Sequence, residues 1–171
     1  NLTSLELAGC DSLENVNFLA DLANLTDLTL SFRLADEQWE GEDMEIVGDS
    51  SIKNIDGLNN CTKLTSLTME RSDFLFDLSN LSNLSNLTSL RLSECGIFDN
   101  VDGLANLTNL TSLKLNWCDS LQNVDGLANL TNLTSLDLAY CDALEDVGAL
   151  ANLSKLNSLD LSDCHPIVQP K

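Results

Sequence analysis

The chain has 171 residues, which suits one domain, and its 27 acidic and 8 basic residues give a formal net charge of −19. This charge disfavours binding to nucleic acid or to an anionic membrane surface, because contacts with phosphate depend on lysine and arginine. No apolar run approaches the roughly 20 residues of a membrane-spanning helix, so we expect no direct membrane insertion.

One strand-like segment occurs seven times along the chain. Neighbouring copies are 23 residues apart, except that the second and third are 39 apart, because the second copy carries 16 extra residues. The copies are LTSLELAGC (2–10), LTDLTLSFR (25–33), LTSLTMERS (64–72), LTSLRLSEC (87–95), LTSLKLNWC (110–118), LTSLDLAYC (133–141) and LNSLDLSDC (156–164). The chain is therefore expected to be a repeat array.

Each unit combines two periodicities when its first leucine is taken as position 1. The first part alternates with period 2, which predicts a short strand, whereas apolar residues in VDGLANLTN lie three apart, which predicts a 3₁₀ or short α turn. The apolar positions of the fifth unit are Leu110, Leu113, Leu115, Leu121, Val124, Leu127 and Leu130.

A single unit is not expected to fold alone. Seven buried apolar side chains at roughly 2 kcal/mol each give about 14 kcal/mol, whereas ordering the backbone of one unit costs about 1 to 2 kcal/mol per residue. Stacking in register lets each strand bond to two neighbours and joins the units into one continuous core.

An acidic insertion, 34–49, follows the strand of the second unit. It contains seven acidic residues and no basic one, and Ile52, Ile55 and Leu58 resume the repeat after it. Such a loop could contact a partner through Trp39, bind calcium, or be a solvated segment without function. The ordered spacing of an EF-hand is absent among its candidate calcium ligands, which are Asp36, Glu37, Glu40, Glu42, Asp43 and Asp49.

The pattern LxxLxLxxCxxL followed by VxxLxxLxx resembles the leucine-rich repeat family over essentially the whole chain. It is most similar to the bacterial, internalin-like kind, with a cysteine ladder at position 9, although the units have 23 residues instead of 21 or 22. The resemblance implies an α/β solenoid of about seven coils, with a concave parallel β-sheet and short 3₁₀ or α turns on the convex side.

Five of the six cysteines occupy position 9, and Cys61 lies at position 21 instead. A disulfide framework or a metal site is one interpretation of this pattern. A row of buried thiols is the interpretation we favour, because parallel side chains on adjacent coils do not meet the geometry of a disulfide and CxxC spacing is absent. Ser72 is nearly isosteric with cysteine at position 9, whereas Arg33 is not. The five cysteines at position 9 are Cys10, Cys95, Cys118, Cys141 and Cys164.

Residues at positions 3, 5 and 7 are expected to face the concave side, with position 8 at its margin. Trp117 and Tyr140 share position 8 in adjacent units and should be neighbours, beside Arg91, Lys114 and Asp137 at position 5. This set has the composition of a binding hot spot. Alternatively, the aromatic residues shield the sheet edge and the charged ones form pairs of little consequence.

These observations favour a non-enzymatic recognition domain that binds a protein or carbohydrate partner through its concave face. We expect the domain to belong to a bacterial surface protein or secreted protein. The alternatives are a structural spacer within a cell-surface protein and an intracellular interaction scaffold. Enzyme activity is not expected, because the only histidine, His165, adjoins Cys164 without a further catalytic partner, and no cofactor motif occurs. Residues 1–171 are expected to form one domain of a larger protein with flanking domains, because neither end carries a recognisable cap.

Overall fold

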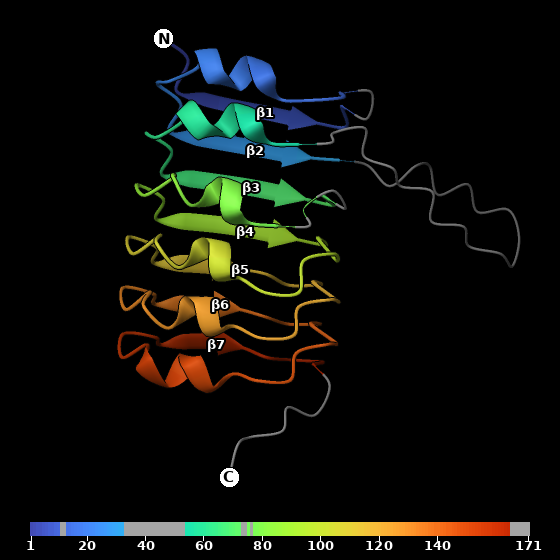
Figure 1. Ribbon diagram of the computed structural model, residues 1–171, viewed down its shortest axis with the longest axis vertical. Coiled ribbons are helices and arrows are strands. Elements are labelled where there is room, and N and C mark those ends of the chain that lie inside the picture. Colours follow the sequence, from blue (N-terminus) through green and yellow to red (C-terminus); the bar gives the residue numbers. More distant parts are fainter. Residues whose placement is uncertain (11–12, 33–53, 73–74, 76, 165–171) are drawn as a thin grey trace, which may run out of the picture.

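The computed structural model describes residues 1–10, 13–32, 54–72, 75 and 77–164 as one stack of seven coils (Figure 1). We number the coils from the N-terminus, so that each begins at the first leucine of its repeat. The strands are β1 (Ser4–Ala8), β2 (Asp27–Ser31), β3 (Ser66–Glu70), β4 (Ser89–Ser93), β5 (Ser112–Lys114), β6 (Ser135–Asp137) and β7 (Ser158–Asp160). The 3₁₀ helices are η1 (Asn17–Asp21), η2 (Asp56–Asn60), η3 (Ser79–Leu81), η4 (Asp102–Leu104), η5 (Asp125–Leu127) and η6 (Gly148–Asn152).

The strands form one parallel sheet in the order of the sequence, from β1 to β7. Each residue pairs with the residue at the same repeat position in the next coil, as Leu113 does with Leu90 and Leu136. The register continues across the insertion, since Leu28 pairs with Leu67. Like residues therefore form rows across the sheet, as the repeat predicts.

The predicted apolar positions form the core. All seven apolar residues of the fifth coil, from Leu110 to Leu130, are 0% exposed, and Ile55 and Leu58 after the insertion are also buried. The terminal coils differ because each has only one neighbour in the sheet. Leu159 occupies the core position 4 of the seventh coil and is 45% exposed.

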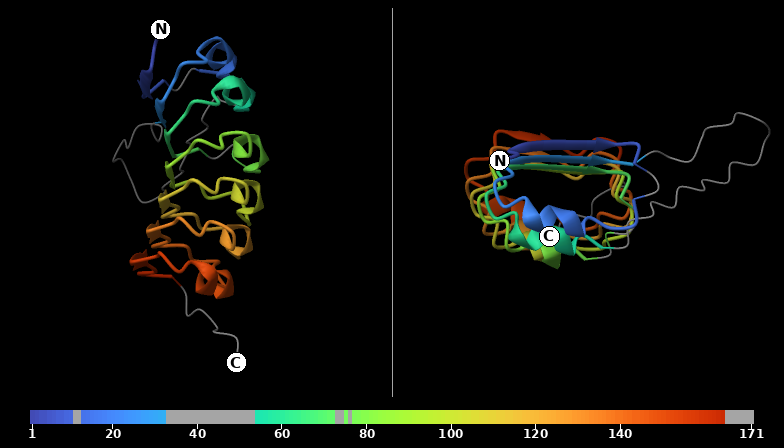
Figure 2. Two further views of the ribbon diagram at one scale, coloured as in Figure 1. Left: turned by 90° about the vertical axis from the view of Figure 1, so that its left-hand side faces the viewer. Right: turned by 90° about the horizontal axis from the view of Figure 1, so that it is seen from above.

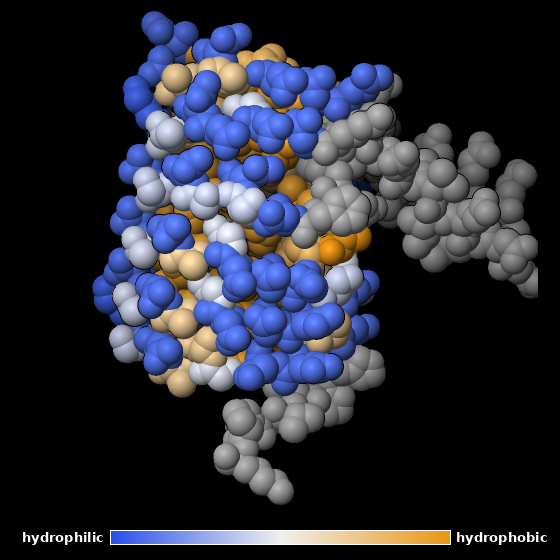
Figure 3. Space-filling model, viewed as in Figure 1, coloured by the Kyte–Doolittle hydropathy of each residue, from blue (hydrophilic) through white to orange (hydrophobic). Residues whose placement is uncertain are grey.

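The coil stack is curved, with the sheet on its concave side and the 3₁₀ helices on its convex side (Figure 2). Hydrophilic residues cover most of the helical side, with hydrophobic residues showing between them (Figure 3). Adjacent coils approach closely there. A Cβ atom added to Gly126 would overlap the backbone carbonyl of Val101. Glycine at this place in the short Asp-Gly turn therefore allows the two coils to pack in contact.

The solenoid predicted from the leucine pattern is thus confirmed. The acidic insertion, including Trp39 and the candidate calcium ligands, lies outside the described residues, as do Arg33, Ile52 and His165. No helix in the described part of the chain is long and apolar enough to cross a bilayer.

Candidate partner-binding surface

The turn after each strand has a left-handed backbone at position 8. Among the described residues, positive φ angles occur at Gly9 (62°), Arg71 (57°), Glu94 (56°), Trp117 (61°), Tyr140 (60°) and Asp163 (56°). A left-handed conformation costs a non-glycine residue roughly 1 to 2 kcal/mol. The sequence analysis missed this feature, for which Gly9 at position 8 of the first coil was the available signal.

Backbone hydrogen bonds explain why the conformation recurs. The N–H of Trp117 donates to the carbonyl of Ala139 across 3.0 Å, and the N–H of Tyr140 donates to the carbonyl of Ser162 across 2.9 Å. The backbone at position 8 therefore extends the parallel ladder beyond the strand. Because the core does not use the side chain, its chemistry can vary from coil to coil.

The second coil is different at this position. Phe32 is only 3% exposed, although its N–H still donates to the carbonyl of Glu70 across 3.3 Å. Its ring turns into the core at the last described residue before the insertion. The outward-facing part of the position-8 row therefore continues from the third coil onward, starting at Arg71.

Trp117 and Tyr140 are the aromatic members of the position-8 row, and we call them the aromatic pair. Their ring centroids are 3.9 Å apart and their planes differ by 6°, so the rings stack face to face. Trp117 remains 47% exposed and Tyr140 36% exposed. The expected neighbour relationship is confirmed, and the indole lies outside the leucine core.

Asp163 continues the row on the far side of Tyr140. A hydrogen bond between the phenol and the Asp163 carboxylate raises the pKa of Tyr140, and the negative charges of Asp163 and, more weakly, Asp160 act in the same direction. The hydroxyl therefore keeps its proton, and a carboxylate lies at the phenol end of the aromatic pair. Nothing in the repeat pattern alone indicated this bond.

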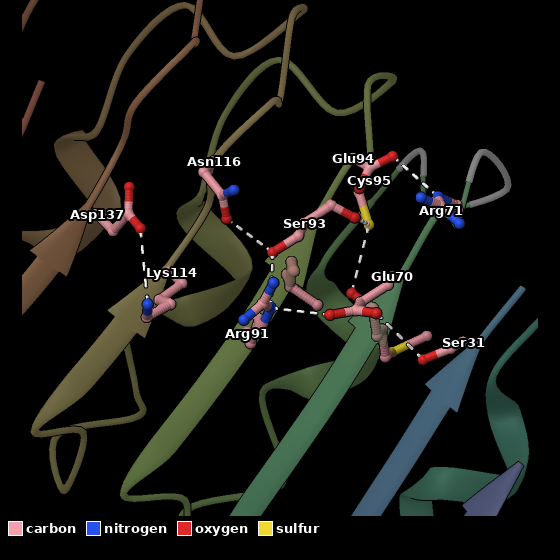
Figure 4. A network of polar contacts seen from close by, with 12 residues as sticks. Ser31, Glu70, Arg71, Arg91, Ser93, Glu94, Cys95, Lys114, Asn116 and Asp137 are labelled. Carbon is pink, nitrogen blue, oxygen red and sulfur yellow. Dashed lines mark hydrogen bonds and ion pairs between the residues drawn. The ribbon is translucent and has the colours of Figure 1, made fainter. Parts of the chain in front are cut away.

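Arg71 and Glu94 occupy the row on the other side of the aromatic pair. Arg71 Nε lies 2.9 Å from Glu94 Oε2, and both side chains are more than 40% exposed (Figure 4). An ion pair this exposed contributes about 0 to 1 kcal/mol. Its structural effect is to direct the Glu94 carboxylate toward the third coil, away from Trp117.

Arg91 belongs to a polar network on the N-terminal side of the concave face. Its Nε lies 3.0 Å from Glu70 Oε1 and donates to Ser93 Oγ at 3.0 Å (Figure 4). Ser93 in turn donates to Asn116 Oδ1 at 2.7 Å, and Ser31 donates to Glu70 Oε2 at 3.2 Å. Arg91 pairs in register with Lys114, and Lys114 with Asp137, as the sequence analysis expected. The ion-pair partner of Arg91 is Glu70, which lies diagonally across from it on β3.

Lys114 and Asp137 face each other on β5 and β6. Lys114 Nζ lies 3.8 Å from Asp137 Oδ2, and Asp137 Oδ1 accepts the N–H of Ala139 at 3.2 Å. The next carboxylate in the row, Asp160, accepts both the hydroxyl and the N–H of Ser162, and these bonds lower its pKa, with a smaller contribution from the charge of Lys114. The ammonium of Lys114 therefore forms an ion pair with Asp137 and also stabilises the charged form of Asp160 on the same face.

The cysteines at position 9 are free thiols, and Cys118 and Cys141 directly follow the two residues of the aromatic pair in the sequence. Cys118 donates to the carbonyl of Leu92 at 3.5 Å, and Cys164 donates to that of Leu138 at 3.1 Å. Burial raises the pKa of Cys118 and raises that of Cys141 to about 12, so these thiols stay protonated and poorly nucleophilic. Within the described ranges no three His, Cys, Asp or Glu side chains are grouped as metal ligands.

Ser72, the residue at position 9 in the third coil, does not fully replace cysteine. It is 0% exposed, as expected from its size, but its hydroxyl has no hydrogen-bond partner. A C–O bond is shorter than a C–S bond, so the hydroxyl reaches less far toward the neighbouring coil.

Comparison with known proteins identifies two stretches, 106–128 and 129–151, that match a family model described as leucine-rich repeat. No curated protein sequence is significantly similar to the chain. The solved structure of internalin C2 from Listeria monocytogenes is similar, with 26% identity and a TM-score of 0.64 over 94% of this chain. The match covers 62% of internalin C2, so this chain spans about three-fifths of that protein.

Two further structures show the fold alone. The Arabidopsis receptor kinase HAESA, solved with the peptide hormone IDA and the co-receptor SERK1, is 24% identical with a TM-score of 0.66, over 98% of this chain and 27% of that one. A leucine-rich repeat protein from Bacteroides eggerthii is 13% identical with a TM-score of 0.63, over 92% of this chain and 41% of that one.

Proposed function

Since this chain is a leucine-rich repeat protein of the internalin-like kind, we propose that it is a non-enzymatic recognition domain that binds a protein partner. The proposed surface comprises the concave face of β4 to β6 and the aromatic pair at its edge.

The exposed aromatic pair is the observation that carries this proposal. Its two rings are held parallel at 3.9 Å on a backbone that the sheet fixes by hydrogen bonds. Rigid aromatic side chains at a surface contribute large contact area at a small cost in conformational entropy, which is typical of binding hot spots. Trp117 makes no contribution to the leucine core that would otherwise account for an indole at this position.

The charged side chains on the concave face support the same function. Lys114 and Asp137, and Arg91 and Glu70, are each paired across neighbouring strands and remain partly exposed. Such pairs contribute little to stability but hold charged groups in fixed positions. A partner that offers complementary charges gains specificity from them.

We further propose that the domain acts at a bacterial surface or after secretion. Its similarity to internalin C2 supports this location. The formal charge of −19 supports a protein ligand over a nucleic acid, because phosphate would be repelled.

The test uses purified surface proteins and glycans on an array, probed with the wild-type chain and with Trp117→Gly. Glycine suits this turn, as Gly9 shows at the same position of the first coil, so the variant loses the indole without losing the fold. Phe18→Ala is the matched control, because Phe18 is also exposed, at 43%, but lies in η1 on the convex side.

We expect at least one protein ligand whose binding falls about tenfold or more in Trp117→Gly and is unchanged in Phe18→Ala. Binding that is confined to glycans would change the ligand class. Negligible and equal binding by all three chains would support a structural spacer and overturn the recognition function.

A further inference from the structure

Resting on the proposed function, we propose that the partner places a cationic side chain, arginine above all, against the open face of the Trp117 indole. The arrangement needed for this contact is an uncovered aromatic face surrounded by carboxylates. The described coils provide both at one edge of the sheet.

One face of the indole is free. Tyr140 covers the face directed toward the C-terminus of the stack, with 6° between the planes. The opposite face is directed toward the fourth coil, where Glu94 occupies the equivalent position. The Glu94 carboxylate is 2.9 Å from Arg71 Nε in the third coil, which is the side of Glu94 away from Trp117. Glu94 therefore does not lie over the indole.

The surroundings of this face are acidic. Four exposed carboxylates occupy positions 8 and 10 of the last four coils, at the end of the strands, and the one basic residue described at position 8 or 10 of any coil is Arg71, in the third coil. Asp119 lies close enough to act on the pKa of both Cys118 and Cys141. The four carboxylates are Glu94, Asp119, Asp142 and Asp163.

The two stacked rings of the aromatic pair also favour a cation. A cation within about 6 Å of an indole face is attracted by the negative charge of the ring quadrupole, and arginine adds planar stacking. The hydrogen bond from Tyr140 to Asp163 increases electron density on the phenol, which strengthens the negative face of the pair. A sugar could also pack on an open aromatic face and donate hydroxyl hydrogen bonds to the carboxylates, but a neutral sugar would gain no charge attraction from them.

The test compares tetra-arginine with tetra-lysine, because the two peptides have equal charge. Binding is followed by isothermal titration calorimetry, which needs no fluorophore and therefore also measures the variants that lack the Trp117 indole. We expect tetra-arginine to bind about fivefold more tightly than tetra-lysine, and we expect this preference to disappear in Trp117→Gly. Trp117→Tyr, which repeats the residue present at position 140, should restore part of it.

Charge is tested separately with Glu94→Gln, which should weaken both peptides about threefold at low salt. Asp21→Asn is the control, because Asp21 is an exposed carboxylate at the end of η1 on the convex side. It removes the same charge and should leave the affinity for both peptides, and the preference for arginine, unchanged.

The inference is overturned if the two peptides bind equally, if neither binds, or if the arginine preference persists in Trp117→Gly. Preferential binding of neutral oligosaccharides over tetra-arginine would also overturn it, in favour of a glycan. The proposed function survives any of these outcomes when a protein ligand on the array still depends on Trp117. If the arginine preference is absent and no protein ligand on the array depends on Trp117, both proposals are overturned.

Discussion

Cys141 donates its thiol hydrogen to the backbone carbonyl of Leu115 in the preceding coil, with sulfur and oxygen 3.1 Å apart. The same bond joins Cys118 to Leu92 and Cys164 to Leu138, so one residue type satisfies one carbonyl in successive coils. Ser72 is buried at the same position without such a bond.

Ser72→Cys should stabilise the chain by about 1 kcal/mol, because the longer thiol reaches the neighbouring carbonyl and adds apolar contact in place of an unsatisfied hydroxyl. The free energy of unfolding in urea, measured under reducing conditions, checks this expectation. Ser72→Ala is the control, since it removes the hydroxyl without adding a donor. Equal stabilisation by both variants would show that the thiol bond contributes nothing.

The buried thiols predict a loss of stability at alkaline pH. Burial raises the pKa of Cys141 from 9.0 to about 12, so the folded chain keeps the proton that the unfolded chain releases. The stabilisation is complete below about pH 9 and decreases as the pH rises from 9 toward 12. Each such thiol should contribute a slope of up to about 1.4 kcal/mol per pH unit to the free energy of unfolding.

Urea titrations at several pH values between 8 and about 11 measure this slope. Cys141→Ala will be less stable at every pH because it leaves a cavity. Its slope above about pH 9 should nevertheless be smaller than that of the wild type, by the contribution of one thiol. Parallel slopes in the two chains would contradict the raised pKa.

Gly126→Ala should destabilise the chain by about 1 to 3 kcal/mol, because the new methyl group would overlap backbone atoms of Val101 in the preceding coil and force the coils apart. Gly96→Ala is the matched control, since nothing lies within 4 Å of a Cβ atom added there. Thermal unfolding of the two variants measures the difference. An equal loss of stability in both would show that the close approach of Gly126 to Val101 contributes nothing to it.

Most of the fold could be predicted from the sequence because the leucine period sets the core and the register together. Leu113 pairs with Leu90 and Leu136 because any shift of one residue would expose the leucines. The insertion does not disturb this register, since Ile55 and Leu58 return to the core. The buried positions of this solenoid can thus be predicted from the leucine repeat in the sequence.

The candidate surface could be predicted only in part. The positions of Trp117 and Tyr140 followed from the repeat, but their left-handed backbone did not, because aromatic residues rarely adopt it. Arg91 and Glu70 form a diagonal pair, and the choice between diagonal and direct partners depends on side-chain rotamers that the sequence does not fix. The bond from Tyr140 to Asp163 was missed for the same reason.

Asp163→Asn should lower the pKa of Tyr140 toward its ordinary value of 10.0, because the phenol loses its hydrogen bond to a carboxylate and the phenolate is no longer repelled by that charge. Tyr140 is the only tyrosine in the chain, so the near-ultraviolet absorbance of tyrosinate reports this residue alone. Asp142→Asn is the control, because Asp142 is exposed at the same edge and is not among the groups that shift this pKa. A pKa that falls only in Asp163→Asn would establish that the Asp163 carboxylate interacts specifically with the Tyr140 phenol. A pKa that stays unchanged, or that falls equally in both variants, would contradict the specific bond and leave only the general acidity of the edge to act on Tyr140.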